Sequence, residues 1–235
     1  MPTRLYFNQQ ISGAPVNPAP SGAWGATAGA GRCILAPWRD GVTPAVTLPH
    51  VRAINIGAGA GSTALDRICI TPGLDGAQSI SGRISGQLMV REYATTDNVD
   101  RAIVNAKLVS NDGATIRAVL LAQGIYGPTL EFVNNATHRN KTLISGTAVV
   151  NVSTVDAQDG DRIVFEIGWS NSTAGTTPQA GALWGGGAYN SPVLPVNETQ
   201  TTAAAGWIDF RDLDLKFRED KFICIEGDDE LLMQP

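Results

Sequence analysis

The sequence predicts an all-β protein, an antiparallel β-sandwich of the jelly-roll type with long arms and loops rich in Gly and Pro. Segments with a period of two dominate the chain, and no long stretch repeats apolar residues at helical spacing. Gly supplies 26 and Pro 13 of the 235 residues. Many short strands separated by Gly, Pro, Asn and Asp turns are typical of sandwiches, and a jelly roll is the natural form for this number of strands.

The run over 80–91 alternates most regularly. Ile80, Ile84 and Leu88 fall on the even positions, whereas the odd positions carry polar residues such as Arg83. Because alternate side chains of a strand point to opposite faces, one face should lie in the core and the other in water. The glycines of this run predict a bulge or a close approach of a neighbouring layer.

The run over 162–169 places a second set of apolar residues on one face, namely Ile163, Phe165, Ile167 and Trp169. Asp159-Gly160-Asp161 before it is a turn signal. The opposite face carries Arg162 and Glu166, which we expect to form an ion pair at the surface.

The remaining strands are expected around one clear hairpin. Asn111-Asp112-Gly113 should join strands at 103–109 and 115–123, because Asp-Gly favours tight turns. A further strand is expected at 142–152. Shorter strands are expected at 3–7, 32–36, 51–56, 66–71, 207–210, 213–217 and 222–225.

These elements predict three parts of the chain: an N-terminal strand and extended arm (1–31), a jelly-roll domain (32–210) and an acidic C-terminal extension (211–235). The arm is rich in Gly, Ala and Pro and contains Trp24. A long loop is expected over 170–206, and loops of that length are usually functional or mobile.

Charge and hydropathy exclude several classes of protein. The net charge is −5, and residues 211–235 carry −4 of it, so the rest of the chain is nearly neutral. This balance argues against broad nucleic-acid binding. No apolar run is long enough for a transmembrane helix, and no signal peptide is visible at the start.

Three cysteines and two histidines leave little room for metal or redox chemistry. Cys33, Cys69 and Cys224 show no CxxC spacing, so we expect small buried hydrophobes. One disulfide, or a link between subunits, is the alternative. His50 and His138 lie in no ligand cluster, which argues against zinc.

Two acidic turns are the metal sites that the sequence allows, one at Asp156, Asp159 and Asp161 and another at Asp97, Asn98 and Asp100. Asp156, Asp159 and Asp161 offer the oxygen ligands that calcium prefers, although no EF-hand pattern surrounds them. A plain turn before the strand at 162–169 explains the same residues. No cofactor is predicted.

Enzymatic signatures are missing or incomplete. The glycines of 57–61 lack the third glycine of a dinucleotide loop and the Lys-Ser/Thr of a P-loop. No GxSxG accompanies the two histidines. Glu92, Glu131 and Glu166 are the carboxylates considered for glycoside hydrolysis. We therefore predict that the protein is not an enzyme.

Four aromatic residues stand in loops rich in Gly and Pro: Trp24, Trp38, Trp184 and Tyr189. Such side chains either bind a partner or anchor a loop by packing beneath it. They are the predicted interface residues. Trp169 and Trp207 are expected in the core.

Several segments occur together in a recognisable order. They are Leu65-Asp66-Arg67, Gly76-Ala77-Gln78-Ser79-Ile80-Ser81-Gly82, Asn111-Asp112-Gly113-Ala114-Thr115-Ile116-Arg117, Tyr126-Gly127-Pro128, Arg139-Asn140-Lys141, Asp159 to Gly168 and Trp207-Ile208-Asp209-Phe210. Over residues 1–210 the chain resembles a family of uncharacterised structural proteins of tailed bacteriophages and prophages. Residues 211–235 depart from the ending of that family. The resemblance implies a β-rich virion component and transfers no active site.

The expected function is that of a non-enzymatic virion protein, a capsid decoration (cement) subunit or a neck or tail accessory. Its partners would be copies of itself and other virion proteins, the major capsid protein or neck and tail proteins, without nucleic acid or membrane. It would reside in the virion, assembled in the bacterial host cytoplasm. The alternative is a carbohydrate-binding sandwich at a tail tip, which would recognise a host glycan.

Overall fold

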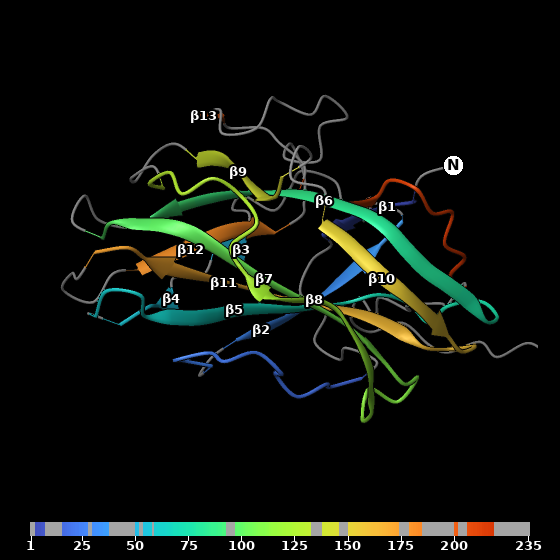
Figure 1. Cartoon of the computed structure of the whole chain (residues 1–235). Helices are drawn as coiled ribbons and strands as arrows, with labels where there is room; N and C mark the ends of the chain where they lie inside the picture. The colour runs from blue at the N-terminus through green and yellow to red at the C-terminus, as the bar shows by residue number, and fades with distance from the viewer. Residues whose placement is uncertain are drawn as a thin grey trace, which may run out of the picture.

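The computed structural model describes residues 3–7, 16–27, 30–37, 50–51, 54–57, 59–92, 97–132, 138–145, 150–173, 179–184, 200–201 and 206–218. The strands of this part (Figure 1) are β1 (Thr3–Phe7), β2 (Gly31–Ala36), β3 (His50–Val51), β4 (Ile54–Asn55), β5 (Thr63–Ile70), β6 (Gln78–Glu92), β7 (Val99–Val109), β8 (Ile116–Gly124), β9 (His138–Ile144), β10 (Val150–Ala157), β11 (Arg162–Asn171), β12 (Gln179–Trp184), β13 (Gln200–Thr201) and β14 (Trp207–Phe210).

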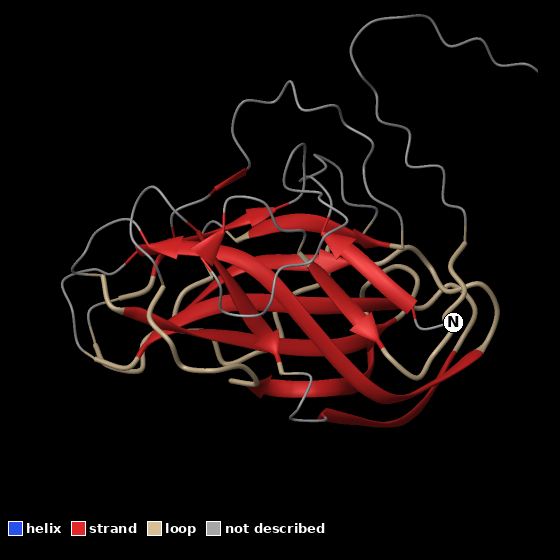
Figure 2. Cartoon of the chain, turned by 90° about the horizontal axis from the view of Figure 1, so that it is seen from above, coloured by secondary structure: helices blue, strands red, loops and turns tan. Residues whose placement is uncertain are grey.

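The predicted all-β class is confirmed. The described residues contain strands, turns and loops and no helix, as Figure 2 shows. Among the described residues there is accordingly no helix that could cross a membrane.

The strands form one mixed sheet that curls on itself. Its main path is β13-β9-β6-β14-β1-β2-β5-β11-β7-β8, and β10 and β12 also pair with β6. The prediction of a purely antiparallel arrangement is wrong for one pair of described strands, since β2 and β5 run parallel and pair Cys33 with Cys69. The chain reaches β5 from β2 by a crossover rather than a hairpin, and a crossover permits parallel pairing.

The curl brings distant strands face to face around one main core. Phe165 of β11 and Phe210 of β14 meet edge to face, with ring centroids 6.2 Å apart. Side chains of β6, such as Ile84 and Leu88, join β11 residues in the same buried cluster. The apolar faces predicted from period two therefore pack against each other, and this burial supplies the main stabilisation.

The glycines of β6 mark the irregularities that the sequence predicted. Gly82 has φ of +92° and lies beside a register shift between β6 and β10. At Gly86 an added Cβ would lie 2.5 Å from Ile208 Cδ1, so β14 approaches closely there. The expected wet face is partly covered, however: Ser85 and Gln87 are buried, whereas Arg83 stays exposed.

The last third of the chain differs most from the expected strands. The run at 142–152 belongs to two strands, β9 and β10, rather than one. The expected loop over 170–206 contains β12 and β13. In the expected strand at 213–217 only Phe217 makes a bridge, to Leu74. The strand expected at 222–225 lies outside the described residues.

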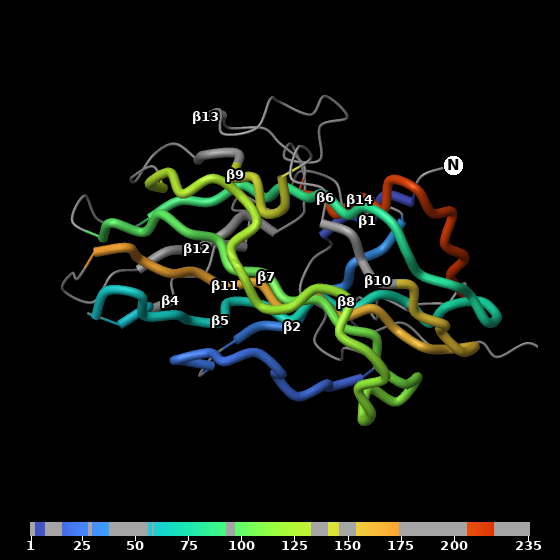
Figure 3. The backbone as a smooth tube through the Cα atoms, in the orientation of Figure 1, coloured from blue at the N-terminus to red at the C-terminus, as the bar shows by residue number. Residues whose placement is uncertain are grey.

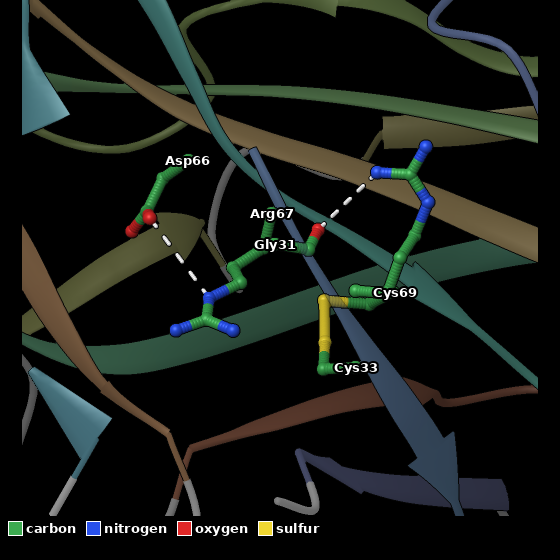
Figure 4. The surroundings of a disulfide bond; sticks show 6 residues. Gly31, Cys33, Asp66, Arg67 and Cys69 are labelled. Atoms are coloured by element: carbon green, nitrogen blue, oxygen red, sulfur yellow. Dashed lines mark hydrogen bonds and ion pairs between the residues drawn. A yellow bond between two sulfur atoms is a disulfide. The ribbon is translucent and has the colours of Figure 1, made fainter. Parts of the chain in front are cut away.

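The structure contains one disulfide, which was the alternative to the expected small buried hydrophobes. Cys33 and Cys69 form a disulfide between β2 and β5, with Cα atoms 4.6 Å apart (Figure 4). Both residues are buried in the main core. Beside them lies Arg67, which is 1% exposed and faces Asp66 at 3.9 Å. Cys224 lies outside the described residues.

Candidate functional site: a latched strap

Residues 16–27 cross the outer face of the sheet, meaning the face of β5, β11, β7 and β8 that points away from the main core. We call this segment the strap. Figure 3 shows it in blue, reaching the β7–β8 turn at one end. An added Cβ at Gly113 of that turn would lie 3.0 Å from Val16 Cβ. At the other end, Ala26 forms a parallel bridge to Ala64 of β5.

Glu166 of β11 is the centre of the strap's attachment. Its carboxylate accepts hydrogen bonds from the backbone N–H groups of Ser21 (2.8 Å) and Gly22 (3.1 Å) and from the Trp24 indole N–H (2.8 Å). It also accepts hydrogen bonds from two side chains of β7, the Lys107 ammonium (2.6 Å) and the Asn105 amide N–H (3.2 Å). A carboxylate can accept this many donors because both of its oxygens offer lone pairs.

The charge of Glu166 is stabilised by these contacts. Burial raises its pKa, but the hydrogen bonds from Lys107, Trp24 and Ser21 outweigh burial and hold the pKa of this carboxyl below its usual value. Lys107 also donates to the Ala19 carbonyl at 2.7 Å. The ion pair therefore joins β11, β7 and the strap.

This geometry corrects the expected surface pair of Glu166 with Arg162. Glu166 is 0% exposed, and its ionic partner is Lys107. Arg162 instead donates to the carbonyls of Thr71 and Asn111. Alternation assigned the correct face to Glu166, but no sequence pattern indicated that the strap covers that face.

The Trp24 ring needs a strand position without a side chain. An added Cβ at Gly168 of β11 would lie 2.5 Å from Trp24 Cζ3 and 2.1 Å from the Ala64 carbonyl oxygen. Only glycine fits between them, and the indole lies over the strand. Trp24 thus anchors the strap to its own sheet. Whether it also meets a partner stays a prediction.

A small apolar cluster lies under the rest of the strap. It contains Leu65, Ile68, Ile70, Val109 and Val164, with Val16 and Trp24 packed against it. This second cluster and the strap together bury the outer face of β11.

The strap is held at both ends, unlike an arm with one free end. Before it comes β1, which pairs with β14 over Thr3 to Tyr6. After it comes β2, which pairs with both β1 and β5. The described part of the predicted 1–31 arm is therefore a connection within the body.

The acidic turn is occupied by protein contacts. Asp159 accepts from the Gly76 N–H and pairs with Arg218. Asp161 accepts from Arg117 Nε at 2.7 Å, and Asp156 is exposed. No group of three or more His, Cys, Asp or Glu residues suited to a metal ion occurs among the described residues.

The three carboxylates considered for hydrolysis do not act as one group in the described structure. Glu166 is bound by the strap, and Glu131 is exposed. Glu92 is 2% exposed and accepts the Val99 N–H at 3.2 Å. Burial raises the pKa of Glu92 to about 7, against the Val99 hydrogen bond, and the charges of Glu131 and Asp97 raise it further.

The other predicted interface residues are not placed by the structure. Trp38 and Tyr189 lie outside the described residues, and Trp184 ends β12, where its side chain is not described. Sequence reasoning missed Asn105 and Lys107 as partners of Glu166. Two polar residues two positions apart in the apolar run 103–109 were the available signal, since they share one face of the strand.

Comparisons with known proteins add little. The sequence matches no protein-family model and no curated protein. A structure of infectious bursal disease virus, Gx strain, is similar at 14% identity and a TM-score of 0.22 over 75% of this chain. The aligned region spans 46% of that viral chain. At this TM-score the similarity carries no argument about fold or function.

Proposed function

We propose that this protein is a non-enzymatic structural subunit of a virion. The observation that carries the proposal is a concentration of exposed large hydrophobic side chains in one short stretch. Ile116, Val119, Ile125 and Leu130 are 49%, 58%, 41% and 45% exposed. Ile116 and Val119 lie on one strand, β8, and exposed apolar side chains that gather in one place mark interaction sites in soluble proteins.

The position of these residues fits an assembly role. β8 ends the main path of the sheet, where it pairs with β7. An end strand with apolar side chains is a risk in an isolated monomer, and native proteins cover or blunt such strands. A subunit whose neighbours cover this stretch avoids that risk.

The resemblance described above supplies the finer proposal. Several of its segments correspond to scaffold elements, such as the β7–β8 turn, the turn before β11 and β14. We therefore assign the chain to a tailed phage or prophage, as a capsid decoration subunit or a neck or tail accessory. In this proposal the curled sheet is a sandwich of the jelly-roll type, assembled with other virion proteins in the bacterial cytoplasm.

The test is quantitative mass spectrometry of purified particles from a host that carries the gene. Hundreds of copies per particle are expected for a decoration subunit, and about a dozen or fewer for a neck or tail accessory. The symmetry of the shell, or of the neck and tail, sets the number of copies at each position. Absence from intact particles, with the protein present in the lysate, would overturn the proposal.

A further inference from the structure

Strand β2 is a corner at which the curled sheet passes from one layer to the other. Residues 31–34 of the strand pair with β5, whereas the last two residues, Leu35 and Ala36, pair with β1. Along the path of the sheet, β6, β14 and β1 therefore lie before the corner, and β5, β11, β7 and β8 lie after it. A strand that changes its partners in this way joins two packed layers.

The Cys33–Cys69 disulfide lies at this corner. The two cysteines are directly opposite one another in the register of β2 and β5, and their Cα atoms are 4.6 Å apart (Figure 4). Both residues are buried, at 1% and 0% exposed. Because backbone pairing already places the cysteines within disulfide range, a reduced chain can fold first and then form the bond without moving its strands.

The strap depends on β2 at both of its ends. Near its start, the Asn17 side-chain oxygen accepts hydrogen bonds from Nε and Nη2 of Arg32, at 3.0 and 2.7 Å. Near its end, Ala26 exchanges backbone hydrogen bonds with the start of β5, and the chain then continues into β2. The strap and β2 therefore run along β5 as one unit, and the bond at Cys33 is the covalent attachment of this unit.

Without the disulfide, β2 is held less firmly than the strands beside it. β2 divides its pairing between two neighbours, whereas β11 pairs along its whole length with β7. The β2–β5 ladder is also parallel, and parallel pairing is slightly less stable per residue than antiparallel pairing. Segments with few ladder hydrogen bonds open locally before the whole fold does. Breaking the bond should therefore free β2 and the strap first.

The compartment of the protein decides whether these cysteines are bonded. The proposed function places synthesis and assembly in the bacterial cytoplasm, where glutathione and thioredoxin keep thiols reduced, and a released particle meets an oxidising environment. There a small-molecule disulfide is the oxidant. One cysteine thiolate attacks it, and the other cysteine then displaces the mixed disulfide. The two protein thiols lose two protons and two electrons, which convert the small disulfide into two thiols.

We propose that the Cys33–Cys69 pair is a redox lock on β2 and the strap. The lock is open, as two thiols, during assembly, and thiol–disulfide exchange closes it after release. Local opening of β2 admits the oxidant, because both sulfurs are buried while the strand is paired. Once the lock is closed, β2 and the strap open only with the whole fold. The timing of closure rests on the proposed function, whereas the local effect of the bond does not.

The first test is hydrogen exchange of the full-length protein, reduced and oxidised, in a Cys224→Ser background that leaves one possible pair of cysteines. Reduction should accelerate exchange on β2 and the strap by at least about tenfold more than on β7 and β11, the internal control. Cys33→Ala with Cys69→Ala should exchange like the reduced protein and ignore reductant. Equal acceleration of all these strands, or none, would overturn the lock.

The second test concerns the timing of closure. Iodoacetamide is added to intact host cells before lysis and, separately, to purified particles, and mass spectrometry then locates the alkylated cysteines. Cys33 and Cys69 should be free thiols in the cells and bonded in the particles. A bond already present in the cells, or free thiols in the particles, would refute this timing. A protein absent from particles would refute the virion role, and hydrogen exchange would still decide whether the bond locks β2.

Discussion

Lys107 of β7 and Glu166 of β11 form an ion pair of 2.6 Å on a face of the sheet that the strap closes to solvent. Their side chains are 1% and 0% exposed. The pair is satisfied only because strap atoms complete it, with the Ala19 carbonyl bound to the ammonium and the Trp24 indole to the carboxylate. The strap and the pair therefore depend on each other.

The first prediction concerns this pair. Glu166→Ala should lower the free energy of unfolding by about 3–5 kcal/mol, because it leaves the Lys107 ammonium buried without its counter-charge. The double change of Glu166→Leu and Lys107→Met should cost less than Glu166→Ala alone, because it removes both charges. Urea unfolding of the three proteins measures the difference.

The matched control is an ion pair at the surface. Arg83 and Asp212 lie 2.8 Å apart, and their side chains are 46% and 40% exposed. Asp212→Asn should cost much less than Glu166→Ala, since water screens the charges and solvates the remaining partner. Equal losses at the buried and the exposed pair would contradict the structure of the strap.

The second prediction separates two contacts of Trp24, the hydrogen bond of its indole to Glu166 and the packing of its ring on β11. Trp24→Phe keeps a ring over Gly168 but removes the donor to Glu166, a hydrogen bond of 2.8 Å. Hydrogen bonds to charged groups contribute about 1.5–3 kcal/mol to the free energy of unfolding. Because Trp24 is partly exposed, we expect Trp24→Phe to lose an amount near the lower end of that range. Hydrogen exchange should accelerate at the Ser21 and Gly22 amides, which bind the same carboxylate. Unchanged exchange there would show that Trp24 does not hold the strap.

The third prediction concerns the disulfide. Cys33→Ala with Cys69→Ala should cost roughly 4 kcal/mol, the loop-closure value for a separation of 36 residues. Thermal unfolding under oxidising conditions measures it. The same double variant should be insensitive to reductant, whereas the natural protein loses stability when reduced.

Alkylation in denaturant distinguishes this bond from a link between subunits. Without reductant, one thiol per chain should react, because the sequence holds 3 cysteines and two are bonded. Three reactive thiols would contradict the pairing of Cys33 with Cys69. A covalent dimer on a non-reducing gel that leaves this pair intact would instead mean a link through Cys224.

Prediction from sequence succeeded where a strand is amphipathic and bounded by turn residues. β1, β11 and β14 begin where expected, and Gly113 and Gly160 adopt positive φ in the turns predicted for them. These features depend on local chemistry alone. Period two and turn residues record it directly in the sequence.

Prediction failed where the environment of a residue is set by distant parts of the chain. The strap brings Trp24 to Glu166 across a separation of 142 residues. Alternation reveals which way Glu166 points but not what covers it. The parallel pairing of Cys33 and Cys69 has the same origin, because the parallel β2–β5 pair depends on the path of the crossover.

The last prediction concerns pH. The pKa of Glu92 is raised to about 7 because the carboxyl is buried, and the nearby charges of Glu131 and Asp97 add to the effect. Since the folded pKa exceeds the unfolded one, the folded state holds this proton more tightly. Stability is therefore greatest below the unfolded pKa and falls as pH rises through the folded value.

Glu92→Gln tests this directly. The amide stays uncharged and its oxygen can still accept from the Val99 N–H, as the carboxylate does at 3.2 Å. At pH 8 the variant should be more stable than the natural protein by on the order of 1–3 kcal/mol, and at pH 4 the difference should vanish. Urea unfolding across this range gives the difference at each pH. Comparing the two proteins cancels the titration of the histidines, which both retain. A constant difference from pH 4 to 8 would mean that Glu92 is not the group that titrates.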